Sequence, residues 1–466
     1  MPKGLPAKKS TDLQIAYIGG GSRGWAWGLM GDLAAEADLS GVVRLYDIDH
    51  QAAKDNVLIG NSLKDHPDAV GKWTYEHAPT LAGALKGTDI VVISILPGTF
   101  DEMESDVHAP EKFGIFQSVG DTCGPGGAIR ALRTVPVYEE FAEAIGEHGP
   151  EAWVINYTNP MAVCVRTLSE VFPAMKAFGC CHEVFGTQDL LRRMLKSEHG
   201  VELAHRSDVR INVLGVNHFT WITQASTGEI DLMPLWEAFS RKHWKEGFES
   251  RPGEWKNGWF SSANRIKMDL TLRFGALAAA GDRHLAEFFG PRYLADPQTA
   301  ASWKFTLTPV SWRKAETERI RARAKAFLSG KERIGVRRSG EEGVSQIKAI
   351  LGLGDMVTNV NMPNVGQAPG WKLGAVVETN ARFTRDSVRP IHAGELPPAA
   401  SALVEHHINI QGMLVQAGLE KDVDLAFRAF MAEPACACLA EDDGWALFRQ
   451  MLRATRKFLP GWKLPR

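Results

Sequence analysis

The first half of the chain alternates short apolar runs with segments of helical periodicity. Apolar runs with the length and composition of buried strands cover residues 13–18, 42–49, 89–96, 152–160 and 175–183. Helix-compatible segments separate them, for example GWAWGLMGDLAAEA after the first run and VCVRTLSEVF after the fourth. Alternation of this kind predicts βαβ units and a parallel sheet with helices on both faces.

The second half is less regular. A further strand with polar residues near its end is predicted at 209–221, and a charged, mostly solvated helix at 312–328. Residues 360–383 predict a loop followed by a strand, in which Asn361 and Asn364 either approach a ligand or form turns.

A glycine-rich turn follows the first predicted strand. Gly19-Gly20-Gly21-Ser22-Arg23-Gly24 matches G-x-G-x-x-G and lies between a strand and a helix, as dinucleotide binding requires. Glycines let the backbone approach a pyrophosphate, whose charge the helix N-terminus stabilises. Asp47 ends the second strand 23 positions after Gly24, where an acid accepts hydrogen bonds from ribose hydroxyls. An acid there favours NAD over NADP, because it repels a 2′-phosphate.

These patterns predict an α/β protein with two domains. The expected organisation is a tail at 1–12, an N-terminal Rossmann-like doubly wound domain at 13–203, and a C-terminal α+β domain at 204–466.

Polar residues recur at the predicted strand ends. They are LPGTF (96–100), NYTNP (156–160), CCHE (180–183), and Asn217 with His218 in the later strand. Ligands of doubly wound sheets bind outside the carboxyl ends of the strands, so these ends together predict one site. Each also has a structural explanation, since asparagine before proline starts turns and a single histidine is often a core residue.

Cysteine and histidine at these ends are candidate metal ligands. Cys181 and His218 are 37 positions apart, and one thiolate with one imidazole leaves a divalent cation open to further oxygen ligands, as in catalytic sites. Strand alternation points Cys180 away from Cys181, so we expect Cys180 to be a packed thiol. Cys436 and Cys438 form a C-x-C that is typical of a packed turn.

Composition narrows the function classes. The 466 residues are 44% hydrophobic and 23% charged, with a net charge of -2, as in ordinary globular proteins. This balance argues against a nucleic-acid or anionic-membrane partner, and no apolar run reaches the roughly 18 residues of a membrane span. The polar N-terminus has no apolar signal core, and six sparse cysteines suit a reducing compartment, so we expect a cytoplasmic protein.

Seven motifs then occur in a fixed order along nearly the whole chain: IAYIGGGSRGW, LYDID, QSVGDTCGPGG, NYTNPM, GCCHEVFG, GVNHFTW and VNMPNVGQAPG. Together they resemble glycoside hydrolase family four, and most closely its α-galacturonidase branch. The resemblance implies NAD and a divalent metal, commonly Mn²⁺, as cofactors. It also implies a small anionic α-glycoside, an α-linked uronide, as substrate. It implies a homodimer or homotetramer built through the C-terminal half, which would be the substrate and oligomerisation domain. This family is an exception to the two-carboxylate scheme of glycosidases.

The resemblance implies a mechanism as well. NAD⁺ takes a hydride from sugar C3, and the resulting ketone, polarised by the metal, acidifies the C2 proton, which a base removes. The C1–O bond breaks by elimination with acid assistance, water adds back, and NADH returns the hydride.

Family residues carry over onto matching positions. The implied metal ligands are Cys181 and His218, and the implied acid is His182. The implied substrate contacts are Asn159, Glu183 and Gln117, with the GPGG run at 124–127 lining the same cleft. The implied cofactor-binding residues are Gly19, Gly21, Ser22, Arg23, Gly24, Asp47, Pro97 and Asn156.

One segment departs from the family pattern. Many members have a tyrosine base in the second domain, and Ala276 stands at that place in LRFGALAAAGDRHLAEFF. Candidate bases or sugar contacts in the same segment are Asp282, His284 and Glu287. The alternative for Asp282 is a helix cap. Candidate partners for a substrate carboxylate, which a guanidinium binds bidentately, are Arg283, Arg130 and Arg133.

Other functions share part of this pattern. The same chemistry serves α-glucosides, α-glucuronides and sulfoquinovosides, and no single residue identifies a uronate. An NAD-dependent dehydrogenase of a sugar or hydroxy acid would share the fold, but such enzymes use a His/Asp pair with arginines and need no thiolate ligand. A non-catalytic NAD sensor would leave the polar strand ends unexplained.

Overall fold

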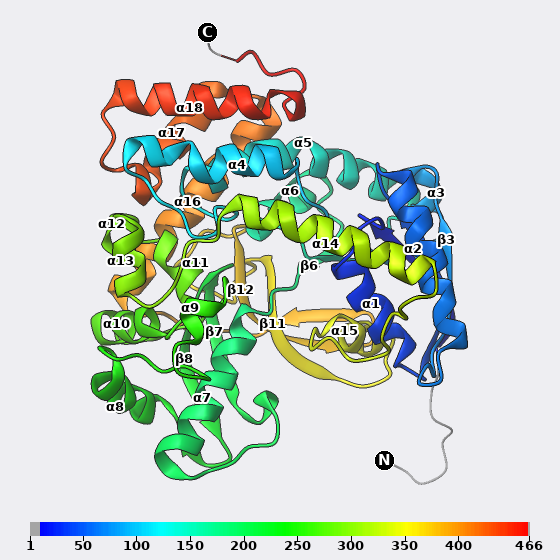
Figure 1. Ribbon diagram of the computed structural model, residues 1–466, viewed down its shortest axis with the longest axis horizontal. Coiled ribbons are helices and arrows are strands. Elements are labelled where there is room, and N and C mark those ends of the chain that lie inside the picture. The colour runs from blue at the N-terminus through cyan, green and yellow to red at the C-terminus, as the bar shows by residue number, and fades with distance from the viewer. Residues whose placement is uncertain (1–9, 465–466) are drawn as a thin grey trace.

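The computed structural model describes residues 10–464. One mixed sheet of 13 strands runs through both halves of the chain, with helices on both faces (Figure 1). The strands are β1 (Ser10–Ile18), β2 (Leu39–Tyr46), β3 (Lys72–His77), β4 (Ile90–Ile93), β5 (Trp153–Asn156), β6 (Lys176–Gly179), β7 (Arg210–Val216), β8 (Phe219–Thr227), β9 (Ile230–Asp231), β10 (Leu277–Ala278), β11 (Met356–Pro363), β12 (Val376–Thr384) and β13 (Ser387–Pro390). Their main order is β10-β8-β7-β12-β11-β6-β5-β4-β1-β2-β3. The expected α/β class is confirmed.

Helices fill the connections between these strands. They are α1 (Trp25–Ala34), α2 (His50–Ser62), α3 (Leu81–Leu85), α4 (Phe100–His108), α5 (Gly124–His148), α6 (Met161–Val171), α7 (Glu183–His199), α8 (Met233–His243), α9 (Glu254–Asn257), α10 (Arg265–Phe274), α11 (Asp282–Glu287), α12 (Pro291–Leu294), α13 (Pro297–Ser302), α14 (Val310–Leu328), α15 (Gly343–Ile350), α16 (Pro398–Glu420), α17 (Val423–Ala432) and α18 (Glu441–Thr455). Within residues 10–464, none combines the length and apolar character that a membrane crossing requires.

The doubly wound part contains the first six strands. They are parallel in the order β3-β2-β1-β4-β5-β6, which is the order of a Rossmann fold. β1 begins at Ser10, so residues 10–12 belong to the sheet and not to the predicted tail; residues 1–9 of that tail lie outside the described range. β6 ends at Gly179, so the argument from strand alternation at Cys180 and Cys181 is wrong, although Cys180 is buried as expected.

The second half extends the same sheet with antiparallel strands. β11 pairs with β6, β12 pairs with β11 and β7, and β8 pairs with β7. Residues 360–363, predicted as a loop, therefore belong to a strand. The single strand predicted at 209–221 is a hairpin whose turn is Asn217 and His218. His218 has φ of 64°, a left-handed backbone conformation that residues other than glycine seldom adopt outside turns.

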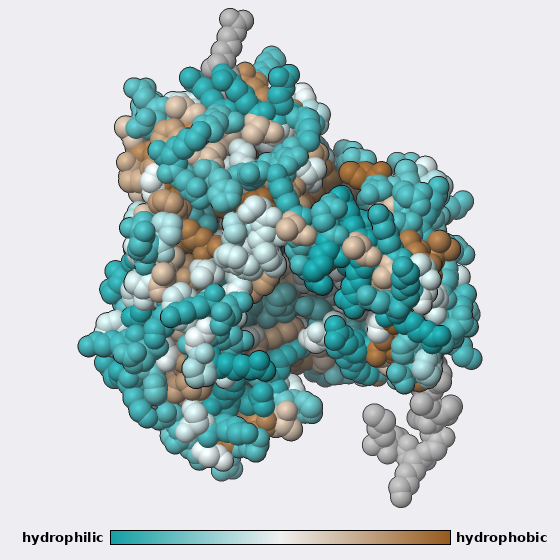
Figure 2. All heavy atoms as spheres, viewed as in Figure 1, coloured by the Kyte–Doolittle hydropathy of each residue, from teal (hydrophilic) through white to brown (hydrophobic). Residues whose placement is uncertain are grey.

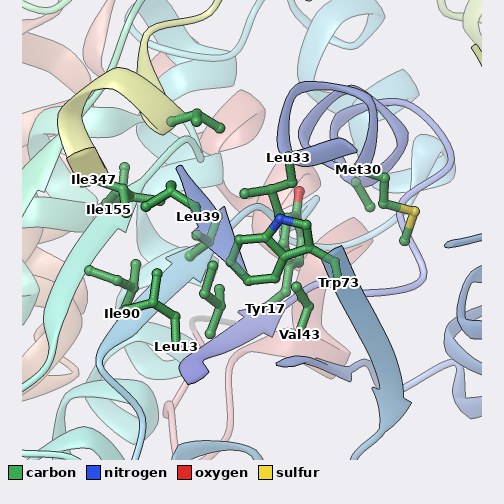
Figure 3. Close-up of a cluster of buried hydrophobic side chains, with 14 of the residues drawn as sticks. Leu13, Tyr17, Met30, Leu33, Leu39, Val43, Trp73, Ile90, Ile155 and Ile347 are labelled. Atoms are coloured by element: carbon green, nitrogen blue, oxygen red, sulfur yellow. The ribbon is translucent and has the colours of Figure 1, made fainter. Parts of the chain in front are cut away.

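Side-chain alternation gives the parallel sheet a separate core on each face. Ile15 and Tyr17 pack with residues of α1, α2 and α15, in the cluster drawn in Figure 3. Ala16 and Ile18 pack with residues of α3, α5 and α6 on the other face. With both faces covered, the loops after the strands are left to form a ligand site at the carboxyl edge.

A segment of the second half crosses the doubly wound part. α14 lies across the front of the molecule in Figure 1 and packs on α4 and α2. It buries only Val310 and Ala324, which confirms the solvated helix. After α14 the chain passes over α1, where the amide and hydroxyl of Ser339 each donate to the Asp32 carboxylate at 2.6 Å. The second half thus holds the helix that follows the glycine loop.

Glu433 joins the C-terminal helices to the start of α5. Its buried carboxylate accepts a hydrogen bond from the Gly124 amide at 2.9 Å. Burial raises the pKa of Glu433 from 4.5 to about 8, and the Gly124 bond opposes this rise in part. The folded chain binds this proton more tightly than the unfolded chain. The stability that protonated Glu433 contributes is therefore fully present below pH 4.5 and is lost as the pH rises through about 8.

We expect Glu433→Gln to flatten this pH dependence. Glutamine keeps an oxygen acceptor for Gly124 and cannot ionise. As the pH rises from about 5 to about 8.5, the unfolding free energy of the variant should therefore increase relative to that of the parent, by up to about 4 kcal/mol. Thermal melts across a pH series measure this, with Glu441→Gln, at an exposed position of α18, as the control. Parallel profiles for Glu433→Gln and the parent would contradict the buried-carboxyl assignment.

Candidate active site

The turn after β1 brings the glycine loop against the end of β2. Gly19 has φ of 94°, and a Cβ there would lie 2.0 Å from the carbonyl oxygen of Ser94, so only glycine fits. The Gly21 amide donates to Asp47 Oδ2 at 2.8 Å. A Cβ on Gly24, the N-cap of α1, would meet no other part of the described chain within 4 Å. The loop therefore leaves space at the N-terminus of α1, with the Asp47 carboxylate beside the loop.

Other predicted cofactor residues lie along the same edge. Ser22 and Arg23 are in the glycine turn, and Arg23 forms an ion pair with Asp55 at 4.0 Å. Pro97 follows β4, is buried, and accepts a hydrogen bond at its carbonyl from Arg133 Nε at 2.8 Å. Their contacts with a cofactor stay predictions.

Asn156 ends β5 with its side chain held inside the fold. The Tyr138 hydroxyl donates to Asn156 Oδ1 at 2.6 Å, and Asn156 Nδ2 donates to the carbonyl of Thr158 at 3.0 Å. These bonds fix the start of the NYTNP loop, so Asn156 has a structural role, and its predicted contact with a cofactor stays a prediction.

Three side chains from different elements converge beyond the strand ends. Asp121 precedes α5, His218 lies in the β7–β8 turn, and His284 lies on α11; one ligand atom from each is within 4.8 Å of the others. Asp121 Oδ1 is 4.0 Å from His218 Nδ1 and 3.9 Å from His284 Nε2. The two imidazole rings stack with centroids 3.8 Å apart. Carboxylate and imidazole are ligands of divalent transition metals, so this group can hold a cation.

Thr122 determines which nitrogen of His218 is available. Its hydroxyl donates to Asp121 Oδ1 at 2.8 Å and lies 2.8 Å from His218 Nδ1. A hydroxyl has one proton to donate, so His218 Nδ1 must donate to Thr122. The lone pair is then on His218 Nε2, the form in which a neutral imidazole binds a metal.

Charges in the cluster are coupled. Burial, with the charge of His284, lowers the pKa of His218 to about 3, so His218 is neutral. Burial opposes ionisation of Asp121, but the two imidazoles hold its pKa below the ordinary value. Burial also acts to lower the pKa of His284, yet that pKa is raised because Glu183 and Asp121 outweigh burial. The site thus combines a neutral ligand, an ionised carboxylate and an imidazole that readily accepts a proton.

Asn159 brings an amide group to the same place. Its Nδ2 donates to Asp121 Oδ2 at 3.4 Å, and Arg130 Nε donates to the carbonyl of Asn159 at 3.0 Å. Asn159 Oδ1 is buried and has no hydrogen-bond partner among residues 10–464. A buried acceptor without a partner is costly, and a cation or a ligand hydroxyl would satisfy it.

The Cys181 thiol lies next to the turn that carries His218. Asn217, the other residue of that turn, hydrogen-bonds the thiol, while burial and the charges of Glu378 and Glu183 raise the thiol pKa well above its ordinary value. Cys181 is not among the three side chains grouped above. The structure therefore brings both predicted ligands to one turn, and the pairing of Cys181 with His218 on a metal stays a prediction.

The two residues after Cys181 face different surroundings. His182 Nδ1 is 3.0 Å from Glu341 Oε1, and 51% of the His182 side chain is exposed. The hydrogen bond to Glu341 raises the pKa of His182. Glu183 turns inward, with Oε1 3.3 Å from His284 Nδ1 and Oε2 accepting from the Gly281 amide at 2.6 Å. His182 is thus an open imidazole, and Glu183 with His284 is a partly buried pair.

Two acids of the GDRHLAEF segment have partners within the fold. The Asp282 carboxylate accepts from the backbone amides of residues 266 and 267 at 3.2 Å each, at the start of α10. Glu287 Oε1 accepts from the amides of residues 119 and 120 at 2.6 and 2.9 Å. Asp282 therefore caps the start of α10 and not α11, the helix that it begins and was expected to cap. It is not among the side chains of the cluster, so a catalytic role for Asp282 stays a prediction.

Arg283 and Gln117 are engaged in the same way. Arg283 is buried and donates to the carbonyl of Ser118 at 2.8 Å. Gln117 Nε2 donates to the carbonyl of Asp106 at 2.6 Å, and Gln117 Oε1 accepts from the Gly126 amide at 2.9 Å. Both support the loop before α5 that carries Asp121, and their predicted substrate contacts stay predictions.

Models of known sequence families match most of the chain. The family model described as Family 4 glycosyl hydrolase matches residues 14–197, and the model of its C-terminal domain matches residues 213–436. The chain belongs to glycoside hydrolase family four.

Relatives match this family four chain over nearly its full length. An alpha-galacturonidase of Thermoanaerobacterium saccharolyticum is 56% identical over 458 residues, which are 98% of each chain. A crystal structure of a Bacillus subtilis glucosidase has a TM-score of 0.92 at 50% identity and covers 95% of this chain and 100% of its own. A 6-phospho-alpha-glucosidase from gut microorganisms, in complex with NAD and Mn²⁺, has a TM-score of 0.78 at 18% identity, with coverage of 98% and 100%; at that identity the likeness concerns the fold.

Sequence reasoning missed two acids, one in the cluster and one that contacts the Asn217–His218 turn, where Asn217 Nδ2 donates to Glu378 Oε2 at 3.4 Å. Asp121 lies inside the motif QSVGDTCGPGG. The pattern that could have identified it is a carboxylate shortly before a helix, in a loop at the edge of the sheet. Glu378 lies on β12, where Asn359 Nδ2 of β11 donates to its Oε1 at 2.7 Å. Burial raises the pKa of Glu378 to about 7. The pattern that could have identified Glu378 is an acid inside the apolar run AVVET.

Ala276, where the family four resemblance predicts a tyrosine, is buried among apolar side chains that include Ala278 and Ala280. The same segment continues into α11, which carries His284. Of the candidate bases in this segment, His284 is the one that the structure places in the cluster with Asp121.

Proposed function

We propose that the chain hydrolyses α-linked galacturonides with NAD and a divalent metal as cofactors. The observation that carries the proposal is the 56% identity, over 98% of both chains, to an alpha-galacturonidase. Membership of a glycosyl hydrolase family favours hydrolysis over the dehydrogenase alternative.

The glycine loop fits NAD. Asp47 is fixed by the amides of Gly21 and Asp49, both at 2.8 Å, in the position where an acid meets ribose hydroxyls. The space at Gly24 adjoins the N-terminus of α1, where amides and the helix dipole favour a pyrophosphate. A carboxylate at Asp47 supports NAD in preference to NADP.

The cluster fits a divalent cation such as Mn²⁺. Asp121 offers an ionised oxygen, His218 a neutral nitrogen, and Asn159 a buried oxygen that lacks a partner in the described chain. Such mixed oxygen and nitrogen donors suit Mn²⁺, and the predicted ligand Cys181 is at the same turn. A 6-phospho-alpha-glucosidase of similar fold is in complex with NAD and Mn²⁺.

The residues of this chain would handle the protons. When bound, the cofactors would supply a hydride acceptor for C3 and a Lewis acid for the C2 and C3 oxygens. His182, open to solvent and with its pKa raised by Glu341, would donate a proton to the leaving oxygen. His284 would take the C2 proton, with Glu183 orienting its ring and stabilising the imidazolium that forms. Asn159 would orient the sugar hydroxyls.

One assay tests this function. An aryl α-galacturonide incubated with the full chain, NAD⁺, Mn²⁺ and a thiol reductant should release its aryl alcohol with no net NADH. NADH formed in proportion to substrate would contradict a hydrolase and indicate a dehydrogenase. Aryl α-glucuronide and α-glucoside serve as matched substrates, and faster release from either would contradict the assignment of the sugar.

A further inference from the structure

A second open space begins at His182. A cleft of about 590 Å³ is lined by residues of α7, of the 204–206 turn and of the 339–341 segment, together with His182. Figure 2 shows a hollow with mainly hydrophilic walls on this face, between the positions of α7 and α15 in Figure 1. Its volume is in the range of about 300–1,000 Å³ that is usual for small-molecule sites.

His182 lines the cleft, and the next residue along the chain contacts the cluster. The residue after it, Glu183, reaches His284 at 3.3 Å, whereas His182 faces Glu341 of the cleft at 3.0 Å. The ring of His182 also stacks on Trp25 at 6.0 Å, which limits its movement. A proton donor must lie within hydrogen-bond reach of the leaving oxygen, so the group that leaves has to extend past His182 into this cleft.

Arg206 is an oriented cation in the cleft. Its guanidinium lies 3.5 Å from the centroid of the Phe185 ring, and it donates to Gln188 Oε1 at 2.9 Å and to Glu342 Oε1 at 2.7 Å. A guanidinium has five N–H donors, and the bonds found within residues 10–464 use two of them. The remaining donors match a carboxylate, which arginine binds bidentately.

The rest of the lining suits a hydroxyl-rich ligand. Its polar members include Asp189, Arg192, His205, Ser339 and Glu341. Arg192 is already paired with Asp189, through Nε at 3.0 Å and a terminal nitrogen at 2.7 Å. Arg206 is also paired, with Glu342, but its bonds within the described chain leave three of its five N–H donors unused, against two on Arg192, which also donates to the carbonyl of Leu203. Donors and acceptors of both signs thus surround Arg206, which fits a sugar with a single carboxylate better than an apolar group.

We propose that this cleft is the subsite for the leaving part of an oligouronide, in which Arg206 binds the carboxylate of the sugar that leaves. The inference rests on the proposed function, because it assigns the leaving side of that reaction.

Two substrates test the subsite. Digalacturonate has a carboxylate on its leaving sugar, whereas the aryl group of an aryl α-galacturonide has none. Arg206→Gln should lower kcat/KM for digalacturonate by about tenfold or more, mainly through KM, and leave the aryl substrate within about twofold. Arg210→Gln removes the same charge four positions away, outside the lining residues, and should behave as the parent on both substrates.

Each outcome decides between the assignments. Equal loss on both substrates, unchanged hydrolysis of digalacturonate, or weaker NAD binding by Arg206→Gln would overturn the subsite. Failure of the parent to hydrolyse the aryl substrate would instead contradict the proposed function. If Arg206→Gln does not fold, Arg206→Lys tests the same point, because it keeps the charge and loses the bidentate fork; a KM increase for digalacturonate alone supports the subsite, and its absence overturns it.

Discussion

Replacing His218 by alanine should abolish Mn²⁺ binding and lower kcat/KM for an aryl α-galacturonide by at least about a thousandfold. The reason is that His218 is buried, neutral at working pH and has its Nδ1 proton directed to Thr122 at 2.8 Å, which leaves Nε2 for the metal. Loss of a Lewis acid removes several kcal/mol of charge stabilisation, which corresponds to about this factor. Mn²⁺ titration by electron paramagnetic resonance and steady-state kinetics measure the two effects.

The control for this variant is His406→Ala, at an exposed imidazole of α16. It should keep both Mn²⁺ affinity and turnover. Retained Mn²⁺ affinity in His218→Ala would contradict a metal at this cluster, even if the turnover fell.

Two further variants identify the partners of His218. Asp121→Asn should weaken Mn²⁺ binding by about tenfold or more, because it removes the ionised oxygen closest to both imidazoles. An equal loss in Cys181→Ser would establish the thiol as a ligand as well. Parent-like affinity in Cys181→Ser would leave the three grouped side chains, with His284 as the third donor, as the metal site.

Local patterns in the sequence predicted five of the six strands of the doubly wound half and missed β3, because KWTYEH alternates buried and exposed positions and forms no continuous apolar run. Buried parallel strands are continuous apolar runs, and the glycine turn must sit between a strand and a helix, so both are read from neighbouring residues. The hairpin at Asn217 and His218 was missed because a two-residue turn without glycine interrupts no pattern. β11 was missed because its asparagines and Pro363 are typical of loops, although it pairs with β12 along its whole length.

The candidate site depends on contacts between distant segments. Asp121 and His284 are 163 positions apart, yet their side-chain atoms are 3.9 Å apart. Only the fold brings the loop before α5 to the start of α11. Sequence reasoning named His284 and His218 from the residue types that catalysis needs. It also named Asp282, because a carboxylate in the same segment can act as a base equally well as long as its hydrogen-bond partners are unknown.

His284→Gln should lower kcat by about a hundredfold to ten-thousandfold, the usual contribution of a general base. It should also abolish exchange of the C2 hydrogen of the substrate with deuterated water. Glutamine retains the length and polarity of the side chain but accepts no proton. Glu183 lies 3.3 Å from His284 Nδ1 and would stabilise the imidazolium that His284 forms. Glu183→Gln should therefore also lower kcat, by a smaller factor than His284→Gln.

Binding measurements separate this role from that of a metal ligand. A base can be removed without loss of the cofactors, so His284→Gln should bind NAD and Mn²⁺ within about threefold of the parent, as should the control His199→Gln at an exposed position of α7. If Mn²⁺ affinity falls together with kcat, His284 is a ligand and the base lies elsewhere. If C2 exchange persists while turnover falls, His284 acts after the proton is removed, and the base must be another group close to sugar C2.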